Sequence, residues 1–174
     1  MSFAKWILIP AGIAAAGILA GTALGLRLNI TPSVPIGLYL EEPPQSNPET
    51  GALVVACLDI DSPATVQAIE RGYLPVGNCP GGVAPVLKPI AAVAGDRVTT
   101  TESGIAVNGR LLPGTAHRGQ DPQGRLLARP AQNYTVPPGT VLLLVNRPGS
   151  FDGRYFGPLP VSNIRGQARP LLLF

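Results

Sequence analysis

The feature that most limits the fold of this chain is an uncharged run of 21 residues, Trp6–Leu26, near its start. A helix of that length reaches about 30 Å, enough to cross the hydrocarbon core of a bilayer. Lys5 and Arg27 flank the run, and the indole of Trp6 is typical of a membrane interface. The run therefore predicts an N-terminal membrane anchor over residues 1–26.

A cleaved signal segment is the alternative, because the run ends in small residues between Ala20 and Gly25. The apolar part of a signal peptide spans about 7–15 residues, and this run is longer, which favours an uncleaved anchor. Under either interpretation residues 27–174 are exported, and their length suits one domain.

The exported part is too rich in helix breakers to be a helical bundle. The whole chain has 21 glycines and 20 prolines, and a proline inside a helix removes a hydrogen bond and clashes with the preceding turn. Loops and short strands accommodate these residues. We therefore expect a mainly β fold with one short helix, following the N-terminal transmembrane helix.

Apolar runs and capping residues locate several elements. Ala52–Leu58 and Val141–Val145 are short apolar runs that predict buried strands. Residues 62–71 predict the helix, because Ser62 or Asp61 can cap its start, Pro63 suits its first position and Gly72 suits a left-handed exit. Its apolar face is expected at Ala64, Ala68 and Ile69, with Val66 at the edge. Residues 41–50 are expected to form a polar, proline-rich loop.

The second half of the chain reads as strands joined by turns. Val86–Ala94 predicts a strand, Gly95-Asp96 a turn, and Val98–Thr101 a further extended segment. Asn108-Gly109, between two apolar triplets, predicts a tight hairpin, because this pair tolerates the positive φ of a type I′ turn. The closing residues PLLLF predict a last strand.

Two cysteines, Cys57 and Cys79, lie in the exported part. In an oxidising compartment an even pair indicates one disulfide, which would stabilise the fold by about 3 kcal/mol. Two buried free thiols are the alternative. The lone His117 and the cysteines supply too few ligands for zinc, so no metal or cofactor is expected. His117 is expected in a solvated loop, which also argues against a histidine-based triad.

The charged residues argue against nucleic-acid binding and draw attention to one lysine. The formal charge is +3, but the eleven arginines are scattered singly, whereas nucleic-acid-binding surfaces cluster their basic residues. The only lysine beyond Lys5 is Lys88, inside the apolar segment VLKPIAAVA. Desolvation there would lower its pKa and make the amine a general base. A lysine whose stem lies along a strand edge, with its head in water, is the alternative.

Ser33 lies directly after the apolar run, in the segment NITPSVPIGLY. Pro32 and Pro35 restrict the backbone around it and could hold its hydroxyl in one orientation. A nucleophile there would meet substrates that are themselves anchored in the membrane.

Three separated segments resemble a known family. TPSVPIGLY resembles the nucleophile box, LKPIAAVAGDRV the lysine box, and NRPGSFDGRYFGPLP the last conserved box of the signal peptidase I superfamily of serine–lysine peptidases. The match is most similar to its conjugative-transfer branch, the TraF-type pilin-maturation peptidases. SGIAVNGRLL, after the lysine box, is similar to the family's following hairpin. The segments occur in the expected order over most of residues 29–160.

The resemblance implies roles for individual residues. Ser33 would be the nucleophile and Lys88 its general base. Thr31 matches the position whose hydroxyl assists the oxyanion hole, alongside the Ser33 backbone N–H. No residue in these segments implies a cofactor.

The last box implies three supporting residues. Ser150 matches a serine that hydrogen-bonds and orients the lysine, while Asp152 and Arg154 match an ion pair that braces the site. A surface turn is the alternative for this box. The chain departs from the family pattern at Pro89, where an arginine is usual, and at Gly153, where a second serine is usual.

The implied activity is a serine endopeptidase on the periplasmic face of a bacterial inner membrane. Its substrate would be a membrane-inserted pilin or other precursor, and its acyl-enzyme would be resolved by water or by the substrate's own N-terminus. A general type I signal peptidase is one alternative, disfavoured by the short chain. A non-catalytic component of a pilus or secretion apparatus is the other.

Overall fold

The computed structural model describes residues 21, 24–129 and 132–174. The predicted anchor, residues 1–26, therefore falls outside the described residues except at 21 and 24–26. Leu26, the last residue of the apolar run, is already the first residue of a strand. Among the described residues, no helix combines the length and apolar character needed to cross a membrane.

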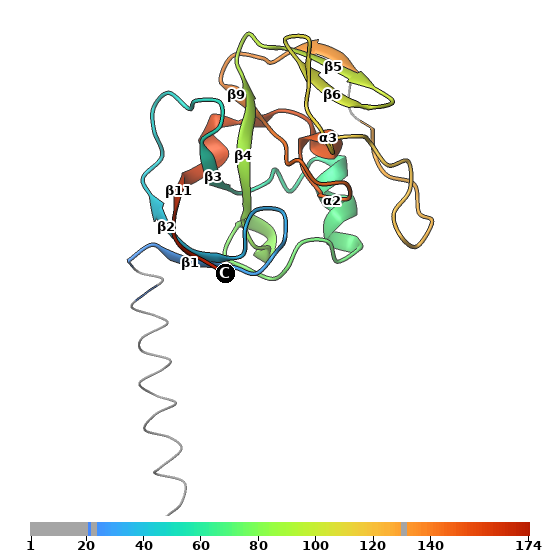
Figure 1. Ribbon diagram of the computed structural model, residues 1–174. Helices are drawn as coiled ribbons and strands as arrows, with labels where there is room; N and C mark the ends of the chain where they lie inside the picture. Colours follow the sequence, from blue (N-terminus) through green and yellow to red (C-terminus); the bar gives the residue numbers. More distant parts are fainter. Residues whose placement is uncertain (1–20, 22–23, 130–131) are drawn as a thin grey trace, which may run out of the picture.

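The described chain is mainly β, as predicted, and forms two sheets (Figure 1). The larger has the strand order β1-β2-β11-β3-β4-β9-β10 and the smaller has the order β7-β6-β5-β8. Every pair of neighbours is antiparallel. The strands of the larger sheet are β1 Leu26–Asn29, β2 Gly37–Glu42, β3 Leu53–Ala56, β4 Val86–Val93, β9 Thr140–Leu143, β10 Leu159–Pro160 and β11 Ile164–Leu173. Those of the smaller sheet are β5 Arg97–Thr101, β6 Gly104–Val107, β7 Arg110–Leu111 and β8 Asn133–Thr135.

The apolar run in β9 is buried on both faces. Val141 and Leu143 belong to a core cluster with Val54 and Ile90 of the larger sheet. Leu142, between them, packs in a second cluster against the smaller sheet. Because successive strand residues point to opposite faces, β9 joins the two cores.

The predicted helix is confirmed as α2, Pro63–Glu70, with Pro63 at its start. Ser62 is the N-cap, since its hydroxyl accepts a hydrogen bond from the Thr65 backbone N–H at 3.3 Å. Gly72, just beyond the C-cap Arg71, has φ +70°. Ala64 and Ala68 face the core, whereas Val66 is exposed. A second helix of one turn, α3 Gly153–Phe156, was not predicted.

The predicted tight hairpin is also confirmed. β6 pairs with β7, and Asn108 and Gly109 between them have φ values of +50° and +82°. Asn108 further accepts a hydrogen bond from the Arg97 backbone N–H at 2.8 Å. Local turn chemistry therefore fixes the register of the β6–β7 hairpin.

Three sequence-based expectations need correction. Glu41 and Glu42 belong to β2 rather than to a 41–50 loop, and the last strand begins at Ile164, well before the closing leucines. His117 lies in a loop but is half-buried, because its Nε2 donates to the Ala128 carbonyl at 2.8 Å and its ring packs 5.0 Å from that of Tyr155.

A disulfide joins Cys57, one residue after β3, to Cys79, one residue before the 3-10 turn Pro80–Gly82. A second 3-10 turn, Val161–Asn163, leads into β11. The disulfide ties the loop before β4 to the end of the strand that pairs with β4.

Candidate active site

Lys88 occupies the buried face of β4. Exposure alternates along this strand, and Lys88 lies on the same face as Val86 and Ile90. Its side chain is 5% exposed. The period of two that buries the apolar residues of β4 therefore also buries the amine.

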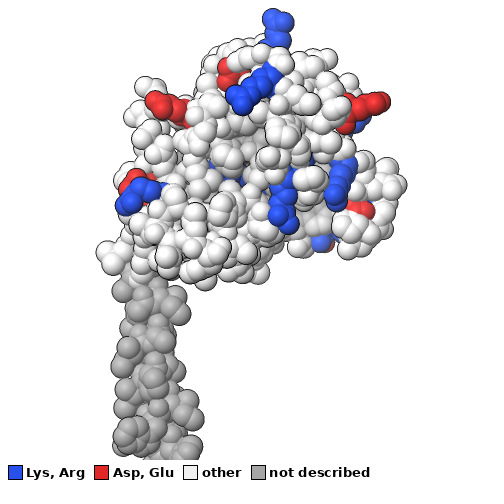
Figure 2. Space-filling model, in the orientation of Figure 1, with Lys and Arg blue, Asp and Glu red and all other residues white. Residues whose placement is uncertain are grey.

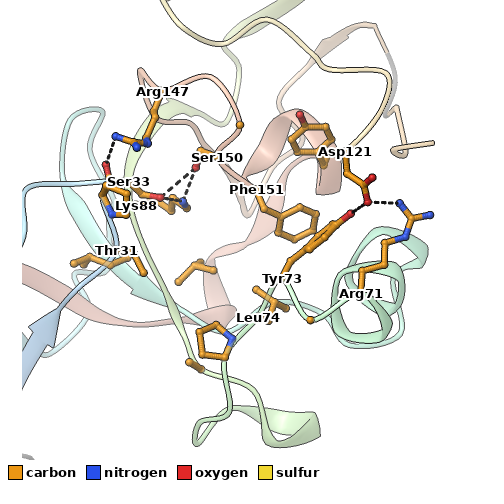
Figure 3. Close-up of a pocket in the computed structure, with 18 of the residues that line it drawn as sticks. Thr31, Ser33, Arg71, Tyr73, Leu74, Lys88, Asp121, Arg147, Ser150 and Phe151 are labelled. Atoms are coloured by element: carbon orange, nitrogen blue, oxygen red, sulfur yellow. Dashed lines mark hydrogen bonds and ion pairs between the residues drawn. The ribbon is translucent and has the colours of Figure 1, made fainter. Parts of the chain in front are cut away.

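Two serine hydroxyls meet the buried amine (Figure 3). Lys88 Nζ lies 3.0 Å from Ser33 Oγ and 2.7 Å from Ser150 Oγ, and the two hydroxyl oxygens are 3.4 Å apart. Ser33 lies in the loop between β1 and β2, whereas Ser150 lies in the turn after β9. Three segments that are distant in sequence thus place three polar side chains in mutual contact.

Burial lowers the pKa of Lys88 from 10.5 to about 8. Two nearby charges act in opposite directions on this pKa: the Asp152 carboxylate raises it and the Arg154 guanidinium lowers it. Because they oppose one another, desolvation remains the dominant cause. A substantial fraction of the amine is therefore neutral slightly above neutral pH.

Asp152 and Arg154 form a buried ion pair behind this cluster. Arg154 Nε donates to Asp152 Oδ1 at 2.7 Å, and both side chains are fully buried. The guanidinium also donates to the carbonyls of Gly114 and Val145, at 2.9 and 2.7 Å. The carboxylate accepts from the Val145 backbone N–H at 3.1 Å. A buried pair with this many partners fixes the turn that carries Ser150 against the end of β9.

Thr31 does not point its hydroxyl proton at Ser33 or Lys88. It is exposed, and its Oγ1 donates to Asn29 Oδ1 at 2.7 Å. The structure thus brings Ser33, Lys88 and Ser150 together and packs Asp152 with Arg154. It leaves Thr31 beside the cluster with its hydroxyl directed at Asn29.

The cluster lines one side of a cavity of about 950 Å³. Tyr73, Leu74, Phe151 and Tyr155 form an aromatic and apolar lining next to it. The Phe151 ring stacks on Tyr155 at 5.8 Å and tilts against Tyr73 at 6.1 Å. Such a lining suits an apolar or small peptide side chain beside the two serines.

The far wall of the cavity is a group of residues that sequence reasoning missed. Asp121 accepts a short hydrogen bond from the Tyr73 hydroxyl, pairs with Arg125 at 2.6 Å and lies 3.7 Å from Arg71 (Figure 3). Arg71 also donates to the Leu126 carbonyl at 2.8 Å. These bonds fasten the 118–127 hairpin to the segment after α2. The only local signal was the Asp-Pro pair that starts the turn.

Comparison with known proteins shows the family to which the chain belongs. Residues 1–173 match the family described as signal peptidase, peptidase S26. The chain belongs to the S26 signal peptidase family. It is 41% identical over 176 residues to the plasmid transfer protein TraF of Escherichia coli, covering 97% of this chain and 94% of that protein.

A second relative is the conjugal transfer protein TraF of Agrobacterium tumefaciens (strain 15955), 40% identical over 153 residues, which covers 86% of this chain and 84% of that protein. A solved signal peptidase I from Enterococcus faecalis V583 matches 70% of this chain and 97% of its own, at 18% identity and a TM-score of 0.37. Both TraF proteins therefore align with most of the length of this chain.

One departure of this S26 chain from the family pattern has a local cause. A Cβ atom added at Gly153 would lie 2.5 Å from Leu142 Cδ1 and 2.8 Å from the Leu143 carbonyl oxygen. The first turn of α3 therefore packs directly on the backbone of β9. Glycine is the residue that fits this close approach.

Proposed function

We propose that this protein is a membrane-associated serine endopeptidase that processes a pilin precursor in plasmid conjugation. One observation carries the proposal: a buried amine of lowered pKa lies 3.0 Å from a serine hydroxyl at the edge of a cavity. A nucleophile and a base within hydrogen-bond reach are the minimum for covalent catalysis.

In the proposed mechanism neutral Lys88 takes the Ser33 proton while Ser33 Oγ attacks the scissile carbonyl carbon. The tetrahedral intermediate collapses, the C–N bond breaks, and the Lys88 ammonium returns its proton to the leaving amine. The product is an ester between Ser33 and the new C-terminus. Neutral Lys88 then activates a second nucleophile, either water or the N-terminal amine of the substrate.

Ser150 keeps the amine oriented in this scheme. With Nζ 2.7 Å from Ser150 Oγ, a neutral amine donates there and directs its lone pair at Ser33. The oxyanion would be stabilised by the Ser33 backbone N–H and, after its hydroxyl turns from Asn29, by Thr31. A donor of this kind is worth about 3–4 kcal/mol in a comparable site.

An exposed apolar surface supports a position at the membrane. Its residues lie in or next to the adjacent strands β1, β2 and β11: Leu24, Leu28, Ile30, Ile36, Leu171, Leu172, Leu173 and Phe174. In the shared orientation of Figures 1 and 2, the lowest part of the surface, near β1 and the C-terminus, is free of charged atoms. Exposed apolar side chains gathered on neighbouring strands support a lipid or protein contact.

The proposed position on the periplasmic face of the inner membrane is supported by the apolar run at the start of the chain and by the disulfide, because disulfides form and persist mainly in oxidising compartments. Pilin is proposed as the substrate because the three segments resemble those of pilin-maturation peptidases, and a role in conjugation is supported by relatives at about 40% identity that are named plasmid or conjugal transfer proteins.

Intact mass spectrometry of a co-expressed pilin precursor tests the proposal, with Ser33→Ala as the matched variant. Processing that requires Ser33 and yields a product one water lighter than the linear fragment would establish a cyclising peptidase. A linear product that requires Ser33 would indicate ordinary proteolysis. Equal processing by both proteins, or failure of an acylating probe to label Ser33 in the unsubstituted chain, would refute the dyad.

A further inference from the structure

The loop that carries Ser33 receives almost no support from its own backbone. In the described part of the chain, no backbone N–H donates to a carbonyl of residues 30–35, and none of these residues donates to a backbone carbonyl. Pro32 and Pro35 have no N–H to offer. A loop of this kind samples many conformations unless side chains hold it in place.

One side chain supplies most of that support. Asn29, the last residue of β1, is 8% exposed. Its Nδ2 lies 2.8 Å from the Thr31 carbonyl, 3.1 Å from that of Val34 and 3.0 Å from that of Pro35. Its Oδ1 accepts from the Thr31 N–H at 3.2 Å and from Thr31 Oγ1 at 2.7 Å. The amide therefore bridges the two ends of the turn around Ser33.

The base of the loop is anchored firmly. Asn29 pairs with Gly37 across β1 and β2, and the neighbouring Tyr39 donates to the Pro35 carbonyl at 2.6 Å. Because the β1–β2 pairing holds the Asn29 backbone, its amide is a fixed reference for the loop. The hydrogen bonds of the Ser33 side chain itself are made only with Lys88 and Ser150 among the described residues.

We propose that Asn29 is a positioning residue of the nucleophile, which holds the 30–36 loop so that Ser33 Oγ stays within hydrogen-bond reach of Lys88. The proposal rests on the proposed serine peptidase function. Asn29 also lines the cavity, but among the described residues all the hydrogen bonds of its side chain go to the 30–36 loop, and through this loop it acts on Ser33. A displacement of about 1 Å at a reacting atom can lower a rate about 10²-fold.

Asn29 also holds the hydroxyl of Thr31. The Thr31 hydroxyl that is aligned with the oxyanion position by resemblance is held by Asn29 Oδ1. Asn29 therefore sets both the position of Ser33 and the resting direction of the Thr31 hydroxyl.

The test is Asn29→Asp in the full chain, with kcat and KM measured on a pilin precursor per mole of folded protein. The aspartate has the same shape and keeps an acceptor for Thr31, but it offers no donor and turns an oxygen toward three carbonyls. We expect kcat to fall about 10²-fold with KM within about twofold. Asn29→Gln, which keeps both groups on a longer stem, is the second variant and is expected to lose at least about tenfold.

Thr65→Val is the matched control. Thr65 is 1% exposed and its hydroxyl accepts from Ser62 Oγ at 2.8 Å, in α2 away from the dyad. This variant loses a buried hydrogen bond as Asn29→Asp does, but its kcat per folded molecule should be unchanged. Equal kcat values for Asn29→Asp, Asn29→Gln and the unsubstituted chain would overturn the inference.

A crystal structure of Asn29→Asp separates this inference from the proposed function. The inference expects Ser33 Oγ to lie beyond hydrogen-bond reach of Lys88 Nζ. An unmoved Ser33 overturns it, even if the unsubstituted chain proves inactive. If the unsubstituted chain is inactive but Ser33 is displaced in the variant, the proposed function is refuted and the positioning role of Asn29 is supported.

Discussion

Lys88 places an amine where β4 otherwise buries aliphatic side chains. Its neighbours on the same strand face are Val86 and Ile90. Because its pKa falls from 10.5 to about 8 in the fold, the unfolded chain binds more protons between those values. The resulting cost, about 3 kcal/mol, is fully present below pH 8 and disappears as the pH rises above 10.5. This loss of stability accompanies a neutral amine, which is the form that the proposed mechanism requires.

The pH dependence of the reaction follows from the same shift. Protonated Lys88 cannot accept the Ser33 proton, so kcat/KM should rise with pH and level off above an apparent pKa of about 8. The measurement is the rate of precursor cleavage between pH 6 and about 10, over which an unperturbed lysine of pKa about 10.4 would give a continuous rise. A profile flat across pH 8 would contradict Lys88 as the base.

At the scale of elements, α3 positions the Ser150 turn through close packing. Gly153 begins α3, and a Cβ atom added to it would lie 2.8 Å from the Leu143 carbonyl oxygen. Asp152, just before it, caps the helix by accepting from the Arg154 N–H at 3.2 Å. The position of this single turn therefore determines where the ion pair, and with it Ser150, lies relative to β9.

Gly153→Ser would restore the serine of the family pattern, and we expect it to harm this chain. The added Cβ would lie 2.8 Å from a backbone oxygen, so α3 must shift away from β9 and Ser150 must shift with it. Overpacking of this kind costs about 1–3 kcal/mol. The free energy of unfolding measured in urea and the rate of precursor cleavage should both be lower than in the unsubstituted chain.

Gly139→Ser is the matched control for that substitution. Gly139 has no atom within 4 Å of an added Cβ, although its φ of +73° adds strain. Its cleavage rate per folded molecule should equal that of the unsubstituted chain. If Gly153→Ser cleaves precursor at that same rate, then the position of α3 does not govern the site.

Elements with local signals could be predicted, and those defined by distant contacts could not. α2 and the Asn108-Gly109 hairpin carry their capping and turn residues within a few positions. The first half of β11 was missed, although its buried residues alternate, because these are Ile164, Gly166 and Ala168 and two of them are small. Asn29 was missed because its side chain donates to backbone carbonyls of an irregular loop. The path of such a loop cannot be predicted from the spacing of apolar residues.

At the scale of the whole molecule, the C-terminal strand β11 connects the two parts of the sheet that carry Ser33 and Lys88, the proposed dyad. Ser33 lies in the loop between β1 and β2, whereas Lys88 lies on β4. In the sheet, β11 and β3 lie between β2 and β4. β11 pairs with β2 on one side and with β3 on the other. Ser33 and Lys88 are therefore brought within hydrogen-bond distance only when β11 is paired between β2 and β3. For this reason no local sequence pattern could predict the distance between them.

The cavity is likewise closed by residues that are distant from one another in the sequence. Asp121 holds Tyr73 and Arg71 across the cavity from the dyad (Figure 3). We expect Asp121→Ala to release the 118–127 hairpin and the Tyr73 ring. KM for a precursor should then rise about tenfold while kcat stays within about twofold, since binding is lost equally before and during the chemical step.

Steady-state kinetics with Glu42→Ala as control check this prediction. Glu42 forms an exposed ion pair with Arg169 at 3.3 Å, on β2 and β11 outside the cavity, and exposed pairs contribute little. Its removal should leave KM unchanged. A fall in kcat for Asp121→Ala without a change in KM would mean that the far wall supports the dyad itself, and that the hairpin is not a binding surface for the peptide.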